Sequence, residues 1–232
     1  MERVAFIGSY DKTDMLLMIA RALVIAGKKV LLVDSTALQK SRYIVPAMKQ
    51  RTPQYITRYE NIDVAEGFIS LQDLNNYYVQ SEGKQLDYDF LLLDIDSAKG
   101  YVGFHVDNTV KQFFVTSIDN YCLKRGLLPF LQAAQPVEVT RVIFSRNMMI
   151  DEIKYLSYLS QNLKIKWNNE TIYFPFENGD QTTIFDNQRT GLIRTKGLTN
   201  QYTDALKYLA EHFVTDIKPS ELSKAFKALD RE

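Results

Sequence analysis

The stretch RVAFIGSYDKTDMLLMIARALVIAGKKVLLVDST, residues 3–36, decides the fold. Residues 4–7 are a short apolar run typical of a strand, and the turn-forming sequence Gly-Ser-Tyr-Asp follows them. Residues 13–26 repeat apolar side chains at helical spacing, and a second apolar run, 30–33, ends at Asp34. We therefore expect a strand, a helix and a strand, with the first loop above the amino end of the helix, where nucleotide-binding proteins hold phosphate.

Length and composition bound the class of protein. The chain has 232 residues, of which 46% are hydrophobic, and this suits one α/β domain with an ordinary core. Lys plus Arg and Asp plus Glu both number 28, so the zero net charge gives no argument for bulk binding to nucleic acid or to an anionic membrane. A single cysteine excludes an internal disulfide, and one cysteine with two distant histidines makes a zinc site improbable. Because no signal peptide precedes the strand at residue 3, we expect a cytoplasmic protein.

The rest of the chain alternates candidate strands with candidate helices. The clearest strand is Phe90–Leu93, which is fully apolar and bounded by acids, as in strands buried on both faces of a parallel sheet. The further candidate strands are 54–59, 109–116, 137–144 and 164–176, with 61–65 read as a short strand or a turn. The candidate helices are 71–80, 123–134, 150–163, 199–214 and 220–229, with 37–49 as a poor helix and 179–189 as a polar loop or short helix.

This order predicts an α/β fold with a doubly wound, mostly parallel sheet of about seven strands and helices on both faces. We assign residues 1–215 to this domain and residues 216–232 to a C-terminal helical appendage. The appendage carries Leu222, Phe226 and Leu229 on one face, and its charges cancel. We expect this face to pack on the domain or on a partner, with membrane contact peripheral at most.

The segment GSYDKT, residues 8–13, partly matches a P-loop, whose pattern is G-x-x-x-x-G-K-[ST]. In a P-loop the backbone N–H groups wrap the phosphates, the lysine neutralises their charge and the hydroxyl holds Mg²⁺. Lys12 and Thr13 stand at the start of the helix, where that pair belongs. Counted from Gly8, however, the segment is two residues too short, and Asp11 replaces the second glycine. A carboxylate at that position would face the phosphate oxygens and repel them.

With strands that end at Asp34 and Asp94 following in order, the chain resembles the MinD/ParA family of deviant Walker ATPases, including the TadZ/CpaE-like members of pilus-assembly systems. The resemblance covers residues 1–215 and rests on order and spacing. It implies that Asp34 polarises the attacking water or the metal shell, so that Asp34 is the catalytic group if the chain is active. It also implies that Asp94 and Thr13 are the residues that hold Mg²⁺.

The same resemblance implies an adenine site. Ser145 and Arg146 match the Asn-Lys/Arg pair that reads adenine, with the asparagine changed, and Pro175 matches the proline that flanks the base. The predicted nucleotide-binding residues are therefore Gly8, Lys12, Thr13, Asp34, Asp94, Arg146 and Pro175. Five of them also have a plainer reading, Lys12 and Thr13 as an exposed residue and a helix cap, Asp34 and Asp94 as cap or loop acids, and Arg146 as a surface cation.

Three features of an active family loop are missing: its length, its second glycine and the early lysine, in whose place Ser9 or its neighbours stand. We therefore favour a MinD/ParA-like pseudo-ATPase. It would form a homodimer and act as a spatial or assembly factor by binding a protein partner within a larger assembly. ATP and Mg²⁺ stay open as cofactors.

Two alternatives stay open. The first is an active ATPase with an atypical P-loop, in which Lys12 clamps the phosphates and Asp34 orients water. The second is a ParA-like partition protein that binds DNA without sequence specificity through surface lysines and arginines. The cations that are close enough in sequence to form such a patch are Arg42, Lys49, Arg51 and Arg58.

Overall fold

The computed structural model describes residues 1–46, 54–109, 111–145, 150–175 and 177–230. The strands are β1 (Glu2–Ile7), β2 (Val30–Ser35), β3 (Tyr55–Tyr59), β4 (Ile62–Glu66), β5 (Phe90–Ile95), β6 (Lys111–Ser117), β7 (Val137–Phe144) and β8 (Ile165–Phe174). The α-helices are α1 (Thr13–Ile25), α2 (Ser41–Ile44), α3 (Leu71–Glu82), α4 (Ala98–Gly103), α5 (Asn120–Leu127), α6 (Ile150–Leu159), α7 (Asn178–Thr190), α8 (Asn200–Glu211) and α9 (Pro219–Leu229). The 3-10 turns are η1 (Val106–Asn108) and η2 (Leu128–Gln132).

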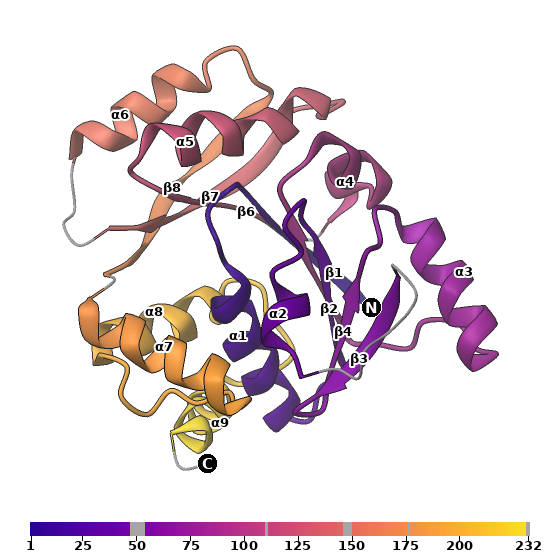
Figure 1. Ribbon diagram of the computed structural model, residues 1–232. Coiled ribbons are helices and arrows are strands. Elements are labelled where there is room, and N and C mark those ends of the chain that lie inside the picture. Colours follow the sequence, from indigo (N-terminus) through magenta and orange to yellow (C-terminus); the bar gives the residue numbers. More distant parts are fainter. Residues whose placement is uncertain (47–53, 110, 146–149, 176, 231–232) are drawn as a thin grey trace.

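The described strands form one sheet of eight in the order β3-β4-β2-β5-β1-β6-β7-β8. Neighbouring strands run parallel except β3 and β4, and helices lie on both faces (Figure 1). The predicted fold class is confirmed. Residues 61–65, for which the sequence allows a strand or a turn, supply most of the additional strand β4. It pairs with β3 because Glu60 and Asn61 take positive φ angles of 48° and 62°, as a tight two-residue hairpin turn requires.

One face of the sheet packs against α1, α8 and α9. Phe213, just after α8, places its ring edge-on to Phe6, Phe90 and Phe113, with ring centroids 6.0, 6.0 and 6.1 Å away. These three residues come from β1, β5 and β6, so one side chain joins the centre of the sheet to the C-terminal helices. The opposite face is covered by α3, α4, α5 and α6 (Figure 1).

Helix α9 packs its apolar side on this same domain, against α1. Its four inward side chains, Leu222, Ala225, Phe226 and Leu229, are all buried. Burial of this face contributes to the core and removes it from contact with any other surface. Among the described residues, no helix has both the length and the apolar character to cross a membrane.

Local capping explains where the observed helices depart from the sequence-based expectation. Helix α4 is not among the helices expected from the sequence, and it forms where the Ser97 hydroxyl accepts the Gly100 N–H at 3.1 Å and caps it. The polar stretch 178–190 is a full helix whose start is closed by a capping box between Glu177 and Asp180. Asp180 also accepts the Thr199 N–H at 2.7 Å, so this polar helix is tied to the start of α8.

Candidate functional site

The loop between β1 and α1 is held tightly above the sheet. The Gly8 N–H donates to the Ile95 carbonyl at 2.9 Å, at the end of β5. Gly8 has a φ angle of +147°, and a Cβ on it would lie 2.0 Å from the Val115 carbonyl oxygen in β6. Only glycine fits this position, because the φ angle and the close approach to a neighbouring strand both exclude a side chain. Gly8 therefore sets where the loop crosses the sheet.

Lys12 fills the inside of this loop with its own side chain. Its ammonium group donates to the Gly8 carbonyl at 2.8 Å and lies 2.6 Å from Oδ1 of Asp94. The residue is only 2% exposed, although lysine is among the residues that are least often buried. The structure thus brings together Gly8, Lys12 and Asp94, which the sequence predicts as site residues, but it joins them to one another. The positive charge of Lys12 is neutralised within the protein.

Asp94 lies at the carboxyl end of β5 and is buried. Burial raises the pKa of this carboxyl to about 7, while the Lys12 charge acts in the opposite direction and the neighbouring Asp34 raises it further. Because the Lys12 charge lowers the pKa of Asp94, this pKa depends on the position of the Lys12 side chain. Removal of Lys12 from the loop would leave Asp94 desolvated without a counter-charge.

Asp11 occupies the start of α1, where a phosphate-binding loop presents N–H groups to an anion. Its Oδ1 accepts the Thr13 N–H at 3.1 Å, and its Oδ2 forms an ion pair with Lys40. The expectation that a carboxylate at this position would face any bound phosphate agrees with this placement, because Asp11 takes a donor of the first helical turn. Asp14 lies beside it, 3.5 Å from Lys40, and burial raises the pKa of Asp14 above its ordinary value.

Asp34 is held by hydrogen bonds from its own loop. It accepts the N–H and the hydroxyl of Thr36 at 3.0 and 2.6 Å, and the N–H and the hydroxyl of Ser41 at 3.1 and 2.7 Å. Four donors satisfy both carboxylate oxygens. In this structure Asp34 therefore holds the segment after β2 in place and binds Ser41, the first residue of α2. The catalytic role that the resemblance implies for it remains a prediction.

Glu66 is the site residue that the sequence analysis missed. In the strand register it stands beside Asp34, which in turn stands beside Asp94, so three acids from β4, β2 and β5 form a row across the sheet. Burial raises the pKa of Glu66, and its carboxylate lies 4.0 Å from the Arg42 guanidinium. The sequence signal that could have identified Glu66 was an acid at the end of the strand-like run IDVAE.

Tyr10 closes the loop on its other side. Its ring stacks on Phe144, at the end of β7, with a centroid distance of 4.6 Å. Burial, with Asp11 as a second cause, raises the pKa of Tyr10 to about 12. The cavity beside this ring measures about 270 Å³ and is lined by Asp11, Asp14 and Lys40 as well as by aromatic side chains. An anion in this cavity would face the carboxylates of Asp11 and Asp14. The cation in the lining, Lys40, is already paired with both of them.

Of the residues implied for adenine and Mg²⁺, the structure places Thr13 and Asp94 at the loop and Pro175 in a groove next to α8. Arg146 lies outside the described residues. Thr13 is buried at the start of α1, and Asp94 is occupied by Lys12. In the part of the chain that the structure describes, no three His, Cys, Asp or Glu side chains come together as metal ligands. In this arrangement Lys12 is paired with Asp94 and the Thr13 N–H donates to Asp11, so these groups are engaged within the protein.

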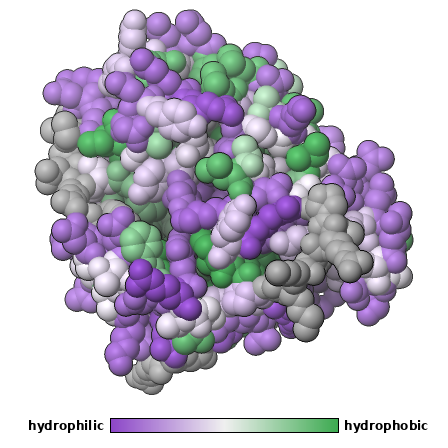
Figure 2. Space-filling model, viewed as in Figure 1, coloured by the Kyte–Doolittle hydropathy of each residue, from purple (hydrophilic) through white to green (hydrophobic). Residues whose placement is uncertain are grey.

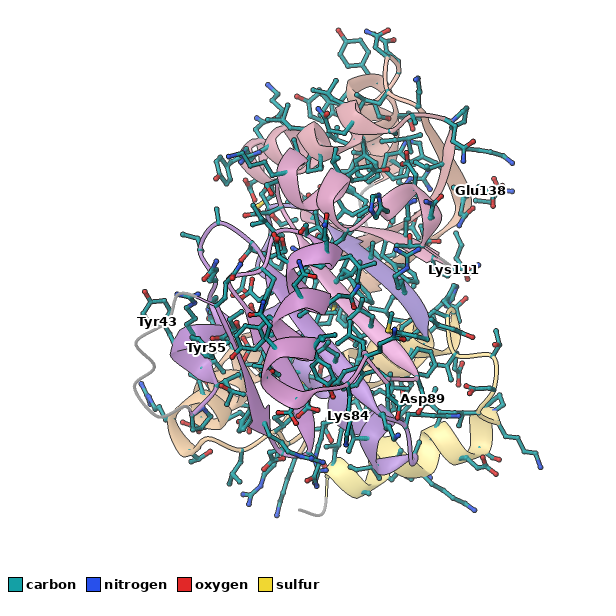
Figure 3. The ribbon with its side chains drawn as sticks, turned by 90° about the vertical axis from the view of Figure 1, so that its right-hand side faces the viewer. Tyr43, Tyr55, Lys84, Asp89, Lys111 and Glu138 are labelled. Atoms are coloured by element: carbon teal, nitrogen blue, oxygen red, sulfur yellow. The ribbon has the colours of Figure 1, made fainter. Side chains whose placement is uncertain are left out.

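The basic patch that was considered for DNA is described only in part. Lys49 and Arg51 lie outside the described residues. Arg42 stacks on the ring of Tyr55, with its guanidinium carbon 5.4 Å from the ring centroid, and it also approaches Glu66. Its charge is thus engaged within the protein. Tyr55 and the neighbouring Tyr43 lie near each other at one side of the molecule in Figure 3.

Comparisons with known proteins place the fold. No protein-family model matches the sequence, and no curated protein is significantly similar to it in sequence. Solved structures do match it. A chain of the MinC:MinD cell division protein complex of Aquifex aeolicus has a TM-score of 0.55 and 16% identity over 94% of this chain and 99% of that one. A ParA family ATPase of Chlorobium tepidum TLS has a TM-score of 0.56 and 10% identity over 92% and 98% of the two chains.

The MinD cell division protein of Aquifex aeolicus also matches, with a TM-score of 0.52 and 17% identity over 94% of this chain and the whole of that one. The three likenesses span nearly the full length of both chains, so the shared architecture includes the central sheet and its helices. Identities this low establish the architecture alone. The chain therefore has the fold of the MinD/ParA ATPases.

Proposed function

We propose that this chain is a MinD/ParA-like pseudo-ATPase that acts through protein contacts as a spatial or assembly factor, in the manner of the TadZ/CpaE-like members of pilus-assembly systems. The observation that supports it most is the internal ion pair of Lys12 with Asp94 at 2.6 Å. The lysine that would neutralise a nucleotide's phosphates is buried and already neutralised. Asp11 adds a negative charge where phosphate would lie.

ATP binding would require several favourable contacts to be broken first. The Lys12 ammonium would have to leave the Gly8 carbonyl and Asp94, and Asp11 would have to leave the Thr13 N–H. Loss of the Lys12 contacts leaves buried polar groups without their partners, which costs about 1–3 kcal/mol and more for a charged group, whereas Asp11 is exposed. These costs oppose the gain from phosphate contacts, so the proposal is that little or no affinity remains.

Isothermal titration calorimetry tests this proposal. With Mg²⁺ present, we expect no saturable heat from ATP or ADP up to about 1 mM nucleotide, a concentration that corresponds to a binding free energy of about −4 kcal/mol. We also expect no phosphate release above the rate of the buffer. Lys12→Ala and, as a matched surface control, Lys29→Ala should behave like the unaltered chain.

The active-ATPase alternative makes the opposite forecast. Micromolar binding of ATP with Mg²⁺ that is lost in Lys12→Ala and kept in Lys29→Ala would overturn the pseudo-ATPase proposal. Turnover that is lost in Asp34→Ala would further support the catalytic role of Asp34. DNA binding by the ParA-like alternative would appear as an affinity that falls steeply with salt.

The proposed homodimer is supported by exposed apolar side chains on the loops and short helices that follow the strands. Leu38 and Tyr43, both after β2, are 84% and 86% exposed, and Ile69 and Val102 are about half exposed after β4 and β5. Figure 2 shows hydrophobic residues in separate groups among hydrophilic ones on the face that is viewed in Figure 1. The proposal is that a second copy covers Leu38 and Tyr43, whose apolar side chains would leave water on dimerisation.

Light scattering tests the dimer. We expect a mass of about twice 26.8 kDa without nucleotide. Serine at both Leu38 and Tyr43 should raise the dimer dissociation constant at least about tenfold, because two large apolar side chains would leave the interface. Tyr158→Ser on α6 is the control, since Tyr158 is also exposed but lies on another surface. A monomer at all concentrations would contradict the proposal.

A further inference from the structure

We propose that the outer edge of β8 and the side of α8 that faces it form a docking groove for an extended peptide segment of a partner protein, which adds to the sheet as a further strand. This inference rests on the part of the proposed function that gives the chain a protein partner. It does not depend on whether nucleotide binds. Figure 1 shows β8 at the margin of the sheet, with α6 above it and α8 below it.

The groove has a volume of about 630 Å³. β8 contributes Thr171–Tyr173, and α8 contributes Gln201, Ala205 and Tyr208, which lie on one side of the helix at successive turns. The lining is partly apolar, through Ile172 and Ala205, and it carries one acid, Asp204, which forms an ion pair with Lys207 at 3.1 Å. A groove between an edge strand and a helix has the shape that receives an extended chain.

The backbone of β8 offers hydrogen-bonding groups to this groove. The Ser145 N–H donates to the Phe174 carbonyl at 3.1 Å, so Phe174 directs its backbone groups toward β7. Successive residues of a strand alternate, and the N–H and C=O groups of Thr171 and Tyr173 therefore point to the open side. β8 is the last strand in the order, and no described strand pairs with its outer side. Unpaired edge groups of this kind are a template for another strand.

Only the second half of the edge is open in this way. In the first half, the pairing with β7 is irregular between Val139 and Arg141, and the extra residues on β8 form a bulge. The Arg141 guanidinium donates to the Asn168 carbonyl at 2.8 Å and so holds the bulge in place. Lys166 forms an exposed ion pair with Glu138 at 2.6 Å beside it. Bulges and charges are the features that protect edges, and Thr171–Phe174 lacks both.

A peptide fits this edge better than a second copy of the chain. Pro175 has no N–H to donate, so the open edge ends there and is four residues long, or about 13 Å. If two copies paired through this edge alone, the contact would be far smaller than the roughly 1,200–2,000 Å² of a stable interface. A short peptide needs no more than this length. It would place one apolar side chain over Ile172 and Ala205.

Tyr173→Pro and Tyr173→Ala together form the test. Both changes remove the same ring, but only proline removes the outward N–H and places its ring in the path of the added strand. Because that N–H is not used by β7, proline should be tolerated in the fold. As the probe, random seven-residue peptides on phage are selected against the full chain, and the strongest sequence is synthesised with a fluorescent label.

We expect the labelled peptide to bind Tyr173→Pro at least about tenfold more weakly than Tyr173→Ala, as measured by fluorescence anisotropy. The backbone amides of Thr171 and Tyr173 should exchange rapidly in the free chain and slowly with peptide bound. If Tyr173→Pro does not fold, Gln201→Trp provides the second variant, because it fills the groove from the exposed side of α8 and should also weaken binding.

Three outcomes would overturn the inference. They are failure of the selection to yield a binding peptide, equal binding to the proline and alanine variants, and self-association of the chain that proline at 173 abolishes. The last outcome would identify a second copy as the occupant. A finding that ATP binds would overturn the pseudo-ATPase proposal and leave the docking groove standing.

Discussion

Lys12→Met is expected to lower the free energy of unfolding by about 3–5 kcal/mol, the usual cost of removing one partner of a buried ion pair. Lys12 and Asp94 are both almost completely buried, and their charged atoms are 2.6 Å apart. Methionine keeps most of the length of the side chain but leaves the Asp94 carboxyl desolvated without the counter-charge that lowers its pKa. Chemical denaturation at pH 8, where Asp94 of the unaltered chain is ionised, measures the effect.

Lys29→Met is the matched control. It breaks a second Lys–Asp pair with the same 2.6 Å separation, that of Lys29 with Asp87, but there both side chains are largely exposed. Exposed pairs contribute about 0–1 kcal/mol, because water and salt screen them. Similar losses in the two variants would show that the Lys12–Asp94 pair is not desolvated. The double variant Lys12→Met, Asp94→Leu should recover much of the loss, since it removes both charges together.

The same pair predicts how stability changes with pH. Burial raises the folded-state pKa of Asp94 to about 7, above its ordinary value of 3.8. The folded protein therefore holds this proton more tightly than the unfolded chain does, and ionisation of Asp94 lowers stability as pH rises from about 4 to about 7. Asp94→Asn should lack this contribution to the slope.

Gly8→Ala is expected to cost about 3 kcal/mol or more, through two separate effects. The φ angle of +147° is strained for any residue with a side chain, which alone costs about 1–3 kcal/mol. In addition, the new Cβ would lie 2.0 Å from the Val115 carbonyl oxygen, so β6 or the loop must move. Thermal and chemical unfolding measure the loss.

Two other glycines separate these effects. Gly83 ends α3 with a φ angle of +65° and has open space around it, so Gly83→Ala should cost only the backbone term, about 1–2 kcal/mol. Gly179 lies inside α7, also in open space, and alanine there should stabilise by about 0.5–1 kcal/mol. If Gly8→Ala cost no more than Gly83→Ala, the close approach to Val115 would not hold the loop.

Regular patterns allowed most of the fold to be predicted from the sequence. Buried parallel strands such as 90–95 read as unbroken apolar runs, and amphipathic helices such as 200–211 repeat at helical spacing. The helix at 98–103 could not be predicted in this way, since it is short and depends on one cap at Ser97. The polar helix at 178–190 similarly depends on contacts of Asp180 with a distant segment.

The candidate site was predicted to a similar extent. The positions of Asp34 and Asp94 at the carboxyl ends of strands and of Lys12 at the start of α1 followed from order and spacing, and the structure has them there. Their bonding partners did not follow. The contact of Asp34 with Ser41 depends on the path of the loop after β2. The place of Glu66 in the row of acids depends on strand order, which places β4 and β5 on either side of β2.

The amino-acid sequence by itself determined the α/β class, the central strand–helix–strand unit and the shortened loop with its misplaced carboxylate, because these depend on local patterns and on the spacing of residues along the chain. Only the tertiary structure decided that Lys12 turns inward to Asp94, and that the second half of β8 is left as an open edge beside α8. The physical reason is that burial and pairing arise between segments distant in sequence: 82 residues separate Lys12 from Asp94. Lys12 gains a buried partner only when the folded sheet places Asp94 beside it.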